Sequence, residues 1–284
     1  MSGTADDPHP FTYRTGASEV RVTFFATDVN NHLVEPVDRD DFAVVDSGLV
    51  IRDFRSLTRS NETALDVVVL VDASGSVEPG FRAVISDVRR LVSRRPAAGG
   101  ENISIVSFSD LRPVLLCSHD CGSPANEHRL LAVTAGGPTP LFDTLAYAAN
   151  FSASRRIPGV RQVLVLFSDG NDTISMISAR DALRAVIDSG ALIYAVDLNE
   201  SDASNGSAFL ERMADATGGR YFPVRQGDIN VLQAALDDLR ASYVVTYPLP
   251  SRVAGFHSLR ILPKHNLNLR FHCRSGYNYD ESIP

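Results

Sequence analysis

Leu65-Asp-Val-Val-Val-Leu-Val71 is an almost continuous apolar run, and Asp72-Ala-Ser-Gly-Ser76 follows it directly. A β-branched run of this kind is typical of a strand that is buried on both faces of a parallel sheet. Ligands of open α/β sheets bind at the carboxyl ends of such strands. We therefore expect Asp72, Ser74 and Ser76 to present oxygen atoms at that edge, as is needed to hold a hard divalent cation such as Mg²⁺.

The same short motif is also typical of a helix start. Serine and aspartate are favoured cap residues, and Ser76 is followed by Glu78 and Pro79. A helix is expected to follow, because apolar residues are spaced along one helical face at Phe81, Val84, Ile85, Val88, Leu91 and Val92. The motif alone does not distinguish a cation site from a helix cap, so segments elsewhere in the chain must decide between them.

Two distant segments favour the cation site. Gly136-Gly-Pro-Thr139-Pro-Leu-Phe-Asp143 is a glycine- and proline-rich turn that presents a threonine hydroxyl where a helix begins. Val163-Leu-Val-Leu-Phe-Ser168-Asp169-Gly170 is a second apolar strand, and it ends in an acidic residue. Because parallel strands share one carboxyl edge, we expect Asp169 to lie at the same edge as Asp72.

Together, these segments resemble the von Willebrand factor type A (VWA) domain and its metal-ion-dependent adhesion site. The resemblance implies that Asp72, Ser74 and Ser76 belong to the first metal loop, Thr139 to the second and Asp169 to the third. It also implies that Asp169 reaches the metal through water. Mg²⁺, with Mn²⁺ or Ca²⁺ as alternatives, takes about six oxygen ligands, and these side chains leave its shell incomplete. We expect an Asp or Glu carboxylate of a protein partner to complete it.

The rest of the central region alternates apolar strands with helices. This pattern predicts an α/β fold with a doubly wound, mostly parallel, Rossmann-like sheet. Ile103–Phe108 and Val114–Cys117 are short strands around a turn, and the nearby Pro113 suits an antiparallel edge strand. A capping serine at Ser178 and a stop at Gly190 bound one of the helices.

The two ends of the chain have short strands and no helical period. We expect strands at Val20–Val29, Phe42–Asp46 and Val50–Leu57, and again at Ser242–Tyr247, Phe256–Leu262 and Leu267–Cys273. Neither set is long enough for its own core, so we expect one β-sandwich into which the central domain is inserted. The predicted boundaries are 1–14 for a flexible tail, 15–60 plus 241–279 for the split sandwich and 62–240 for the VWA domain.

The flanking segments resemble those of a bacterial VWA-related group that is common in acidobacteria. The resemblance rests on Asp40-Asp-Phe-Ala-Val-Val-Asp-Ser-Gly48, Leu239-Arg-Ala-Ser-Tyr-Val-Val-Thr-Tyr247 and Arg274-Ser-Gly-Tyr277. Proteins of this group are mostly exported, so the resemblance implies an extracytoplasmic or secreted protein. The polar segment Met1–Pro10 lacks the apolar core of a signal peptide, and a leader that has been removed or a cytoplasmic location are both compatible with that.

The cysteines also bear on where in or outside the cell the protein is located. Cys117-Ser-His-Asp-Cys121 places two thiols within reach of a disulfide, which needs an oxidising compartment. A metal site of Cys117, His119 and Cys121 is an alternative that lacks further ligands, and two buried thiols are another. We favour the disulfide, partly because the resembling group is mostly exported.

Composition excludes some partners. The chain has a formal net charge of −7, its only lysine is Lys264, and the arginines form no run. These features argue against a nucleic-acid or anionic-membrane surface. No apolar stretch is long enough to span a membrane, and the oligomeric state is not indicated. His257, His265 and His272 are expected to be exposed to solvent.

We therefore predict a protein-binding or adhesion module that is not an enzyme. One alternative is a Mg²⁺-dependent phosphoryl-transfer enzyme, which also places an aspartate at the end of the first strand of a doubly wound sheet. Phosphatases of the haloacid dehalogenase type usually carry a second carboxylate two residues later, where this chain has Ser74. A second alternative is a structural subunit of an envelope or secretion assembly.

Overall fold

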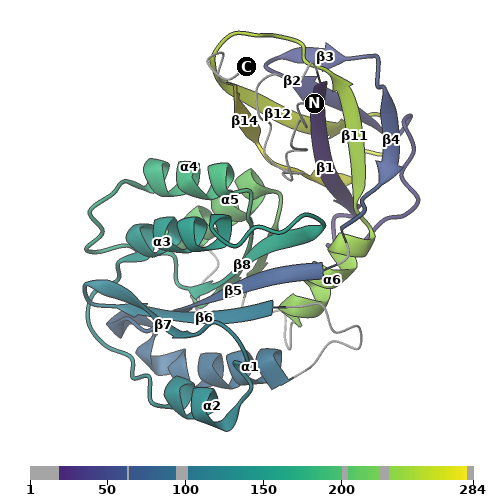
Figure 1. Cartoon of the computed structure of the whole chain (residues 1–284). Coiled ribbons are helices and arrows are strands. Elements are labelled where there is room, and N and C mark those ends of the chain that lie inside the picture. Colours follow the sequence, from purple (N-terminus) through teal and green to yellow (C-terminus); the bar gives the residue numbers. More distant parts are fainter. Residues whose placement is uncertain (1–18, 63, 94–101, 200–203, 224–229, 280–284) are drawn as a thin grey trace, which may run out of the picture.

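The predicted central strand is β5 (Ala64–Asp72), which lies inside a six-stranded sheet (Figure 1). The computed structural model describes residues 19–62, 64–93, 102–199, 204–223 and 230–279. The other strands of the sheet are β6 (Asn102–Ser109), β7 (Arg112–Cys117), β8 (Val160–Ser168), β9 (Leu192–Asp197) and β10 (Arg220–Pro223). Their order is β10-β9-β8-β5-β6-β7, and every pair is parallel except β6 and β7. The predicted sheet with one antiparallel edge strand is confirmed.

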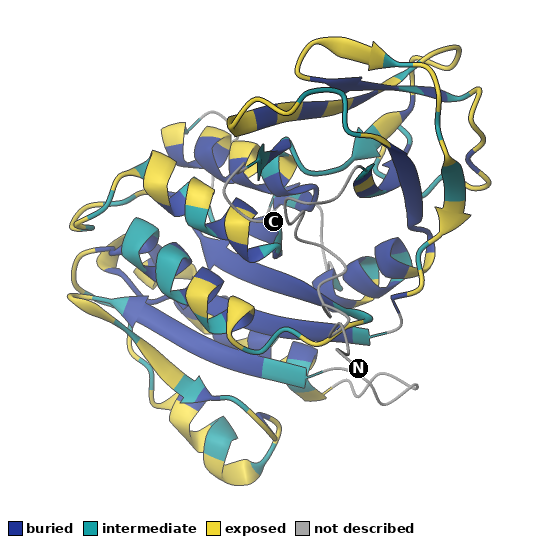
Figure 2. Ribbon diagram, turned by 45° about the horizontal axis from the view of Figure 1, so that its top comes forward, coloured by how far each residue is buried: buried dark blue, intermediate teal, exposed yellow. Residues whose placement is uncertain are grey.

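Helices cover both faces of this sheet and bury two apolar cores (Figure 2). One face packs against α1 (Phe81–Ser93), α2 (Pro124–Leu131) and α6 (Val231–Arg240), and the other against α3 (Leu141–Ala153), α4 (Ala179–Ser189) and α5 (Asn205–Thr217). Successive side chains of a strand point to opposite faces. Val67, Val69 and Val71 of β5 accordingly belong to the first core, and Val68 and Leu70 to the second.

Local signals in the sequence explain most helix ends. Ser178 caps α4 by accepting a hydrogen bond from the Asp181 backbone N–H, and Gly190 ends it in the left-handed conformation. Pro79 differs from expectation, because it lies in a separate 3₁₀ turn, η1 (Gly75–Gly80), ahead of α1. Helix α2 was not predicted, since Leu130 is its only buried residue and an apolar period is missing. No helix in the described ranges is long and apolar enough to cross a membrane.

The two chain ends form two antiparallel sheets, as predicted for a sandwich. The first contains β1 (Glu19–Thr27), β4 (Ser56–Arg59), β11 (Tyr243–Pro248) and β13 (Arg270–His272) in the order β13-β1-β11-β4. The second contains β2 (Phe42–Asp46), β3 (Leu49–Ile51), β12 (Gly255–Pro263) and β14 (Gly276–Tyr279) in the order β14-β12-β2-β3. An aromatic core lies between the sheets, where the Phe24 and Phe42 rings are 5.0 Å apart.

Two details of this part differ from expectation. The segment 50–57 is not one strand, because β3 ends at Ile51 in one sheet and β4 begins at Ser56 in the other. Strand β14 was not predicted as a separate element. The tail 1–14 lies outside the described residues. The domain boundaries stay a prediction; they fall between β4 and β5 and between α6 and β11.

The expectation of exposed histidines is wrong for His257 and His272, because both rings stack against aromatic neighbours. His257 is 4% exposed and stacks on Tyr277 at 5.1 Å between ring centroids. His272 stacks on Phe25 at 4.6 Å. A histidine in a strand has no sequence signal that distinguishes such buried or partly buried positions from exposed ones.

The sandwich and the α/β domain meet through polar contacts at the α4 and α5 end of the sheet. Arg220 of β10 donates a hydrogen bond to the Asn31 carbonyl at 2.8 Å. The Ser275 backbone N–H donates to the Ala216 carbonyl at 2.9 Å. These bonds join β10 and α5 to loops of the sandwich, so the two parts share a specific contact.

His272 contributes a neutral ring to this contact. Its Nδ1 is 3.2 Å from the Gly219 carbonyl oxygen, which only accepts, so Nδ1 carries the proton. Its Nε2 is 2.9 Å from the Thr27 hydroxyl and therefore accepts. Burial, with the charges of Arg220 and Arg270, lowers the pKa of His272 to about 4. The folded protein therefore resists protonation at a pH where the unfolded chain takes up the proton.

We expect this histidine to make the protein less stable in acid. The unfolded chain binds a proton below a pH of about 6.5 and the folded protein only below about 4, so stability falls as the pH drops between these values. The contribution is up to roughly 3 kcal/mol. Urea unfolding at a series of pH values should show a smaller acid-induced loss for His272→Gln than for the natural protein. Identical pH profiles of the two proteins would contradict this.

Candidate metal centre

The predicted metal loops lie at the carboxyl edge of the central sheet. Asp72 is the last residue of β5, Asp169 follows β8, and Thr139 lies just before α3. Asp72 and Ser74 are fully buried, and Thr139 and Asp169 are nearly so. Ser76 is exposed, so a site built from these side chains is open to solvent at Ser76.

Hydrogen bonds fix the first loop around its carboxylate. The Ser74 backbone N–H donates to one Asp72 oxygen at 2.9 Å, and the Ser168 hydroxyl donates to the other at 2.6 Å. The Ser74 and Ser76 hydroxyl oxygens are 3.1 Å apart. The alternation of one carboxylate and two hydroxyls therefore places their oxygens on one side of the turn.

The environment of Asp72 disfavours an isolated charge. Burial raises the pKa of Asp72 to about 6, while the hydrogen bonds from Ser168 and Ser74 act in the opposite direction and Asp169 adds to the rise. A buried carboxylate without a counterion is costly. A cation in the loops would supply the missing positive charge and hold Asp72 ionised.

Backbone hydrogen bonds tie the first loop to the second. Gly75 N–H donates to the Gly137 carbonyl at 2.9 Å, and Gly136 N–H donates to the Ala73 carbonyl at 2.8 Å. Gly137 has φ +78°, and a Cβ there would lie 2.1 Å from a carboxylate oxygen of Asp110. A side chain is rarely tolerated at this positive φ, so glycine suits the turn that faces the first loop.

The third loop is held from both sides. Thr139 N–H donates to the Thr173 hydroxyl at 2.7 Å, and Thr173 N–H returns a bond to the Thr139 carbonyl at 2.9 Å. The Asn199 side chain donates to the Asp169 carbonyl at 2.7 Å. A Cβ at Gly206 would lie only 1.9 Å from that same carbonyl oxygen, so α5 packs directly against the loop.

The donor set fits a hard divalent cation. Asp72 and Asp169 supply carboxylates, and Ser74, Ser76 and Thr139 supply hydroxyls, all of which are hard oxygen donors. The Thr139 hydroxyl makes no hydrogen bond with any residue in the described ranges, although its side chain is nearly buried. Within those same ranges, no cluster of three or more His, Cys, Asp or Glu side chains offers another site. The assignment of these five residues to a metal is a proposal.

Sequence reasoning missed the residues that support the loops. Ser168 was part of the predicted motif, but its bond to Asp72 was not foreseen. Thr173 and Asn199 carry no sequence signal, because their partners are far away in the chain. For Ser168, the signal was available: a hydroxyl beside the predicted acid at the end of the neighbouring strand.

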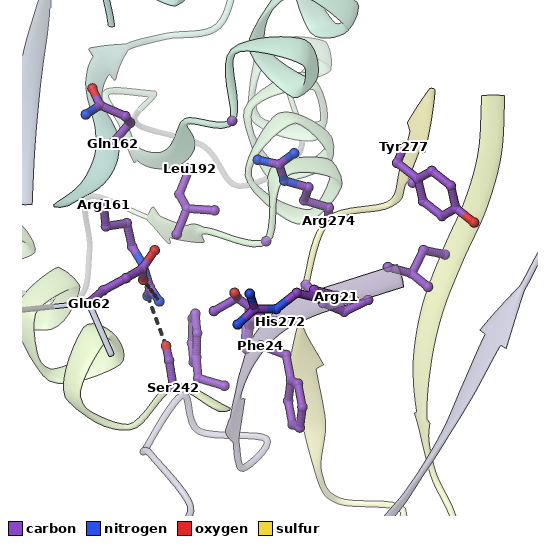
Figure 3. A pocket seen from close by; sticks show the side chains of 18 of the residues that line it. Arg21, Phe24, Glu62, Arg161, Gln162, Leu192, Ser242, His272, Arg274 and Tyr277 are labelled. Carbon is purple, nitrogen blue, oxygen red and sulfur yellow. Dashed lines mark hydrogen bonds and ion pairs between the residues drawn. The ribbon is translucent and has the colours of Figure 1, made fainter. Parts of the chain in front are cut away.

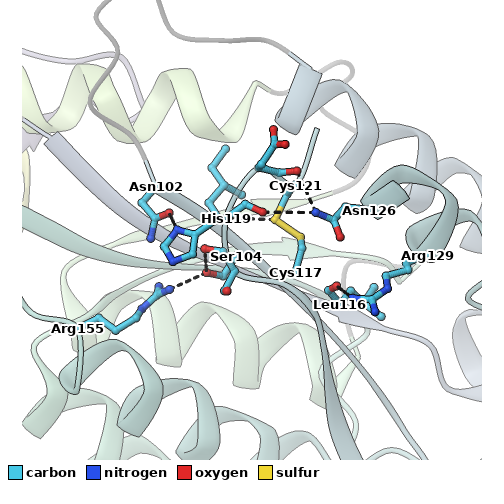
Figure 4. Close-up of a disulfide and its surroundings, with 12 residues drawn as sticks. Asn102, Ser104, Leu116, Cys117, His119, Cys121, Asn126, Arg129 and Arg155 are labelled. Atoms are coloured by element: carbon cyan, nitrogen blue, oxygen red, sulfur yellow. Dashed lines mark hydrogen bonds between the residues drawn. A yellow bond between two sulfur atoms is a disulfide. The ribbon is translucent and has the colours of Figure 1, made fainter. Parts of the chain in front are cut away.

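Cys117 and Cys121 are joined by a disulfide at the end of β7, with Cα atoms 5.5 Å apart (Figure 4). Both residues are buried against the core of the α1 face. His119 lies between them in the chain, is exposed, and has its ring Nδ1 3.2 Å from the Asn102 side-chain oxygen. The bridge thus closes a short loop between the edge strand and α2.

We expect loss of this bridge to destabilise the protein by about 2 kcal/mol, because a short closed loop restricts the unfolded chain only modestly. The double variant Cys117→Ala with Cys121→Ala should show this change in urea unfolding. Adding reductant to the natural protein is the control, since it opens the bridge without removing sulfur atoms. An unfolding midpoint that reductant does not move would contradict the prediction.

The geometry defines a class: a doubly wound α/β domain with an oxygen-rich loop cluster at the carboxyl edge of its sheet. The chain belongs to the von Willebrand factor type A domain family, whose model matches residues 66–238. Domains of this family are typically interaction modules without enzymatic activity, and many bind a divalent metal. No curated protein matches the chain in sequence.

Several solved structures share the fold at low sequence identity. A von Willebrand factor type A protein from Catenulispora acidiphila is 11% identical, with a TM-score of 0.50 over 87% of this chain and 76% of that one. The type V pili tip protein Mfa5 from Porphyromonas gingivalis is 14% identical, with a TM-score of 0.50 over 84% of this chain and 57% of that one. These similarities concern the fold alone.

Proximal thread matrix protein 1 from the mussel byssus, solved with a zinc-occupied MIDAS motif, is 17% identical. Its TM-score is 0.46, over 68% of this chain and 49% of that one. The present chain therefore spans about half the length of this relative.

Proposed function

We propose that this protein is a divalent-cation-dependent protein-binding module, in which a metal held by the three loops captures an Asp or Glu side chain of a partner. Mg²⁺ is the proposed ion, with Mn²⁺ and Ca²⁺ as alternatives. Asp72, Ser74, Ser76 and Thr139 hold it directly, and Asp169 acts through water. The support comes from one observation: a fully buried carboxylate lies beside paired hydroxyls in a site that opens outward.

The rim of the site supports a protein as the ligand. Leu111, Ile174 and Met176 are exposed apolar residues, and Met176 is 91% exposed. The Asp110 N–H donates to the Pro138 carbonyl, which places the β6–β7 turn beside the second loop. Apolar side chains around a polar centre are typical of a binding surface. The preferred partner therefore presents an acidic side chain flanked by apolar residues.

The phosphoryl-transfer alternative has less support. Such enzymes need positive groups around the transferred phosphate. The chain has a single lysine, Lys264, which follows β12 in the sandwich and donates to the Arg39 carbonyl. The structural-subunit alternative differs from our proposal only in the role of the metal.

The disulfide supports export, since such bridges persist in oxidising compartments.

A peptide selection tests the proposed function. We expect a displayed library of random peptides, bound in Mg²⁺ and eluted with EDTA, to yield sequences that share an Asp or Glu. Thr139→Ala removes one hydroxyl ligand and should lower recovery by about tenfold or more, whereas Thr139→Ser keeps the hydroxyl and should retain most of it.

Thr58→Ala, at an exposed position in the sandwich, is the control for a lost threonine elsewhere. Peptides that bind equally well in EDTA, or that share no acidic residue, would contradict the capture of a carboxylate. If the metal-free protein still retained such peptides, the metal site would have a purely structural role.

A further inference from the structure

The first turn of α5 contacts the third metal loop through its backbone. A Cβ at Gly206 would lie 1.9 Å from the Asp169 carbonyl oxygen, and a Cβ at Gly170 would lie 2.3 Å from the Gly206 carbonyl oxygen. Because both positions are glycine, no flexible side chain separates the helix from the loop. A shift of the Asp169 loop would therefore displace the start of α5 directly.

The other end of α5 contacts the sandwich in the same way. Gly218 ends the helix at φ +80°, and a Cβ there would lie 2.7 Å from the Cys273 carbonyl carbon. The Ser275 backbone N–H donates a hydrogen bond to the Ala216 carbonyl at 2.9 Å. The 13 residues of α5 correspond to about 20 Å at a rise of about 1.5 Å per residue. One helix thus connects the metal loop to the sandwich across that distance.

Hydrogen bonds hold α5 to strand β9 near both ends of the helix. The Ile193 backbone N–H donates to the Thr217 hydroxyl at 2.9 Å, in the last turn of α5. Asn199 follows the end of β9, and its side chain donates to the Asp169 carbonyl at 2.7 Å and lies 3.2 Å from the Ser207 hydroxyl. The helix and the strand are therefore joined as one unit between the metal loop and the sandwich.

The junction of this unit with the sandwich leaves unfilled space. A pocket of about 60 Å³ lies there (Figure 3), and its lining includes Leu192 at the start of β9, Gly218 and His272 of β13. Protein interiors are close-packed and contain few spaces larger than a water molecule. The contact between α5 and the sandwich therefore has room to shift.

We propose that α5 couples the metal centre to the sandwich, so that metal binding tightens the contact between α5 and the sandwich. This coupling rests on the proposed function, because it needs a cation in the three loops. A bound cation would hold the Asp169 loop in one position and, through Gly170 and Gly206, the start of α5. Coupling between two sites is reciprocal, so a disturbed contact with the sandwich weakens metal binding by the same factor.

Replacing Gly218 with alanine tests the coupling from the sandwich side. The new Cβ would collide with the Cys273 backbone, so the contact must open. We expect Gly218→Ala to weaken Mg²⁺ binding by about fivefold or more in calorimetric titration. Gly48→Ala is the matched control, because Gly48 has φ +84° and a Cβ there would meet nothing within 4 Å. It introduces similar backbone strain without a collision and should bind Mg²⁺ as the natural protein does.

Hydrogen exchange measured by NMR tests the coupling from the metal side and needs no variant at the junction. The Ser275 amide donates to Ala216 and should exchange about fivefold more slowly once Mg²⁺ is bound, because the contact opens less often. The Lys264 amide, which donates to the Asp41 carbonyl within the sandwich, is the internal control and should not change. In Asp72→Asn, Mg²⁺ should leave the Ser275 amide unchanged as well.

The coupling is overturned if Mg²⁺ binds the natural protein and leaves exchange of the Ser275 amide unchanged, or if Gly218→Ala binds Mg²⁺ as tightly as Gly48→Ala does. Either result leaves the proposed function standing, since both are obtained with bound Mg²⁺. A natural protein that binds no Mg²⁺ contradicts the proposed function itself, and the coupling with it.

Discussion

Replacing Asp72 with asparagine is expected to weaken Mg²⁺ binding by at least about 100-fold while leaving the fold intact. Asp72 is fully buried between Ser74 and Ser168, each of which donates a hydrogen bond to its carboxylate. An asparagine oxygen can still accept the bond from Ser74, and its amide can donate to the Ser168 hydroxyl. The variant therefore loses the charge that attracts the cation but keeps the local packing.

Calorimetric titration with Mg²⁺ measures this effect, and thermal unfolding in EDTA checks the fold. Glu78→Gln is the matched control, because Glu78 is an exposed acid in η1 next to the first loop and is not a predicted ligand. Its affinity for Mg²⁺ should stay within about twofold, since exposed charges interact weakly. Equal Mg²⁺ affinity of Asp72→Asn and the natural protein would exclude Asp72 as a ligand.

Asp238→Ala is expected to destabilise the protein by about 3–5 kcal/mol, because it leaves a buried charge without its partner. Asp238 is fully buried in α6 and pairs with Arg220, whose Nε donates to it at 2.8 Å. Tyr194 donates a further hydrogen bond at 2.8 Å. Burial raises the pKa of Asp238 to about 6 and Arg220 opposes this, so the pair is charged at neutral pH.

The neighbouring Asp237 provides the control for this prediction. It lies on the same helix, is only partly buried, and contacts Gln233 and Arg240 at the surface. Asp237→Ala should cost less than about 1 kcal/mol, as exposed ion pairs do. If urea unfolding showed similar losses of unfolding free energy for the two variants, the buried ion pair would stabilise the protein no more than the surface pair does. Arg220 also donates a hydrogen bond to the Asn31 carbonyl, so we expect Asp238→Ala to weaken the contact between the α/β domain and the sandwich as well.

The α/β core was predictable because its signals are local. The run Leu65–Val71 is buried on both faces, and the Ser178 and Gly190 signals bound their helix as expected. Short amphipathic elements were harder to predict. Helix α2 buries a single leucine, and the break between β3 and β4 depends on which sheet each strand joins. Neither property is encoded in a residue pattern of a few positions.

The candidate site was likewise predictable only in part. Its proposed ligands were found because each follows a strand or precedes a helix in a short motif. The residues that hold them could not be found in this way: Asn199 and Gly206 act on the Asp169 carbonyl from other elements. The partly buried position of His272 likewise depends on Phe25 and Gly219, which are distant in sequence.

Anomalous diffraction from a crystal soaked in Mn²⁺ tests the central claim most directly. Our account predicts a manganese peak between the three loops, within about 2.3 Å of the hydroxyl oxygens of Ser74 and Ser76 and with a water or a carboxylate in the outward position. The absence of a peak there at saturating Mn²⁺, or a peak that persists in Asp72→Asn, would contradict it.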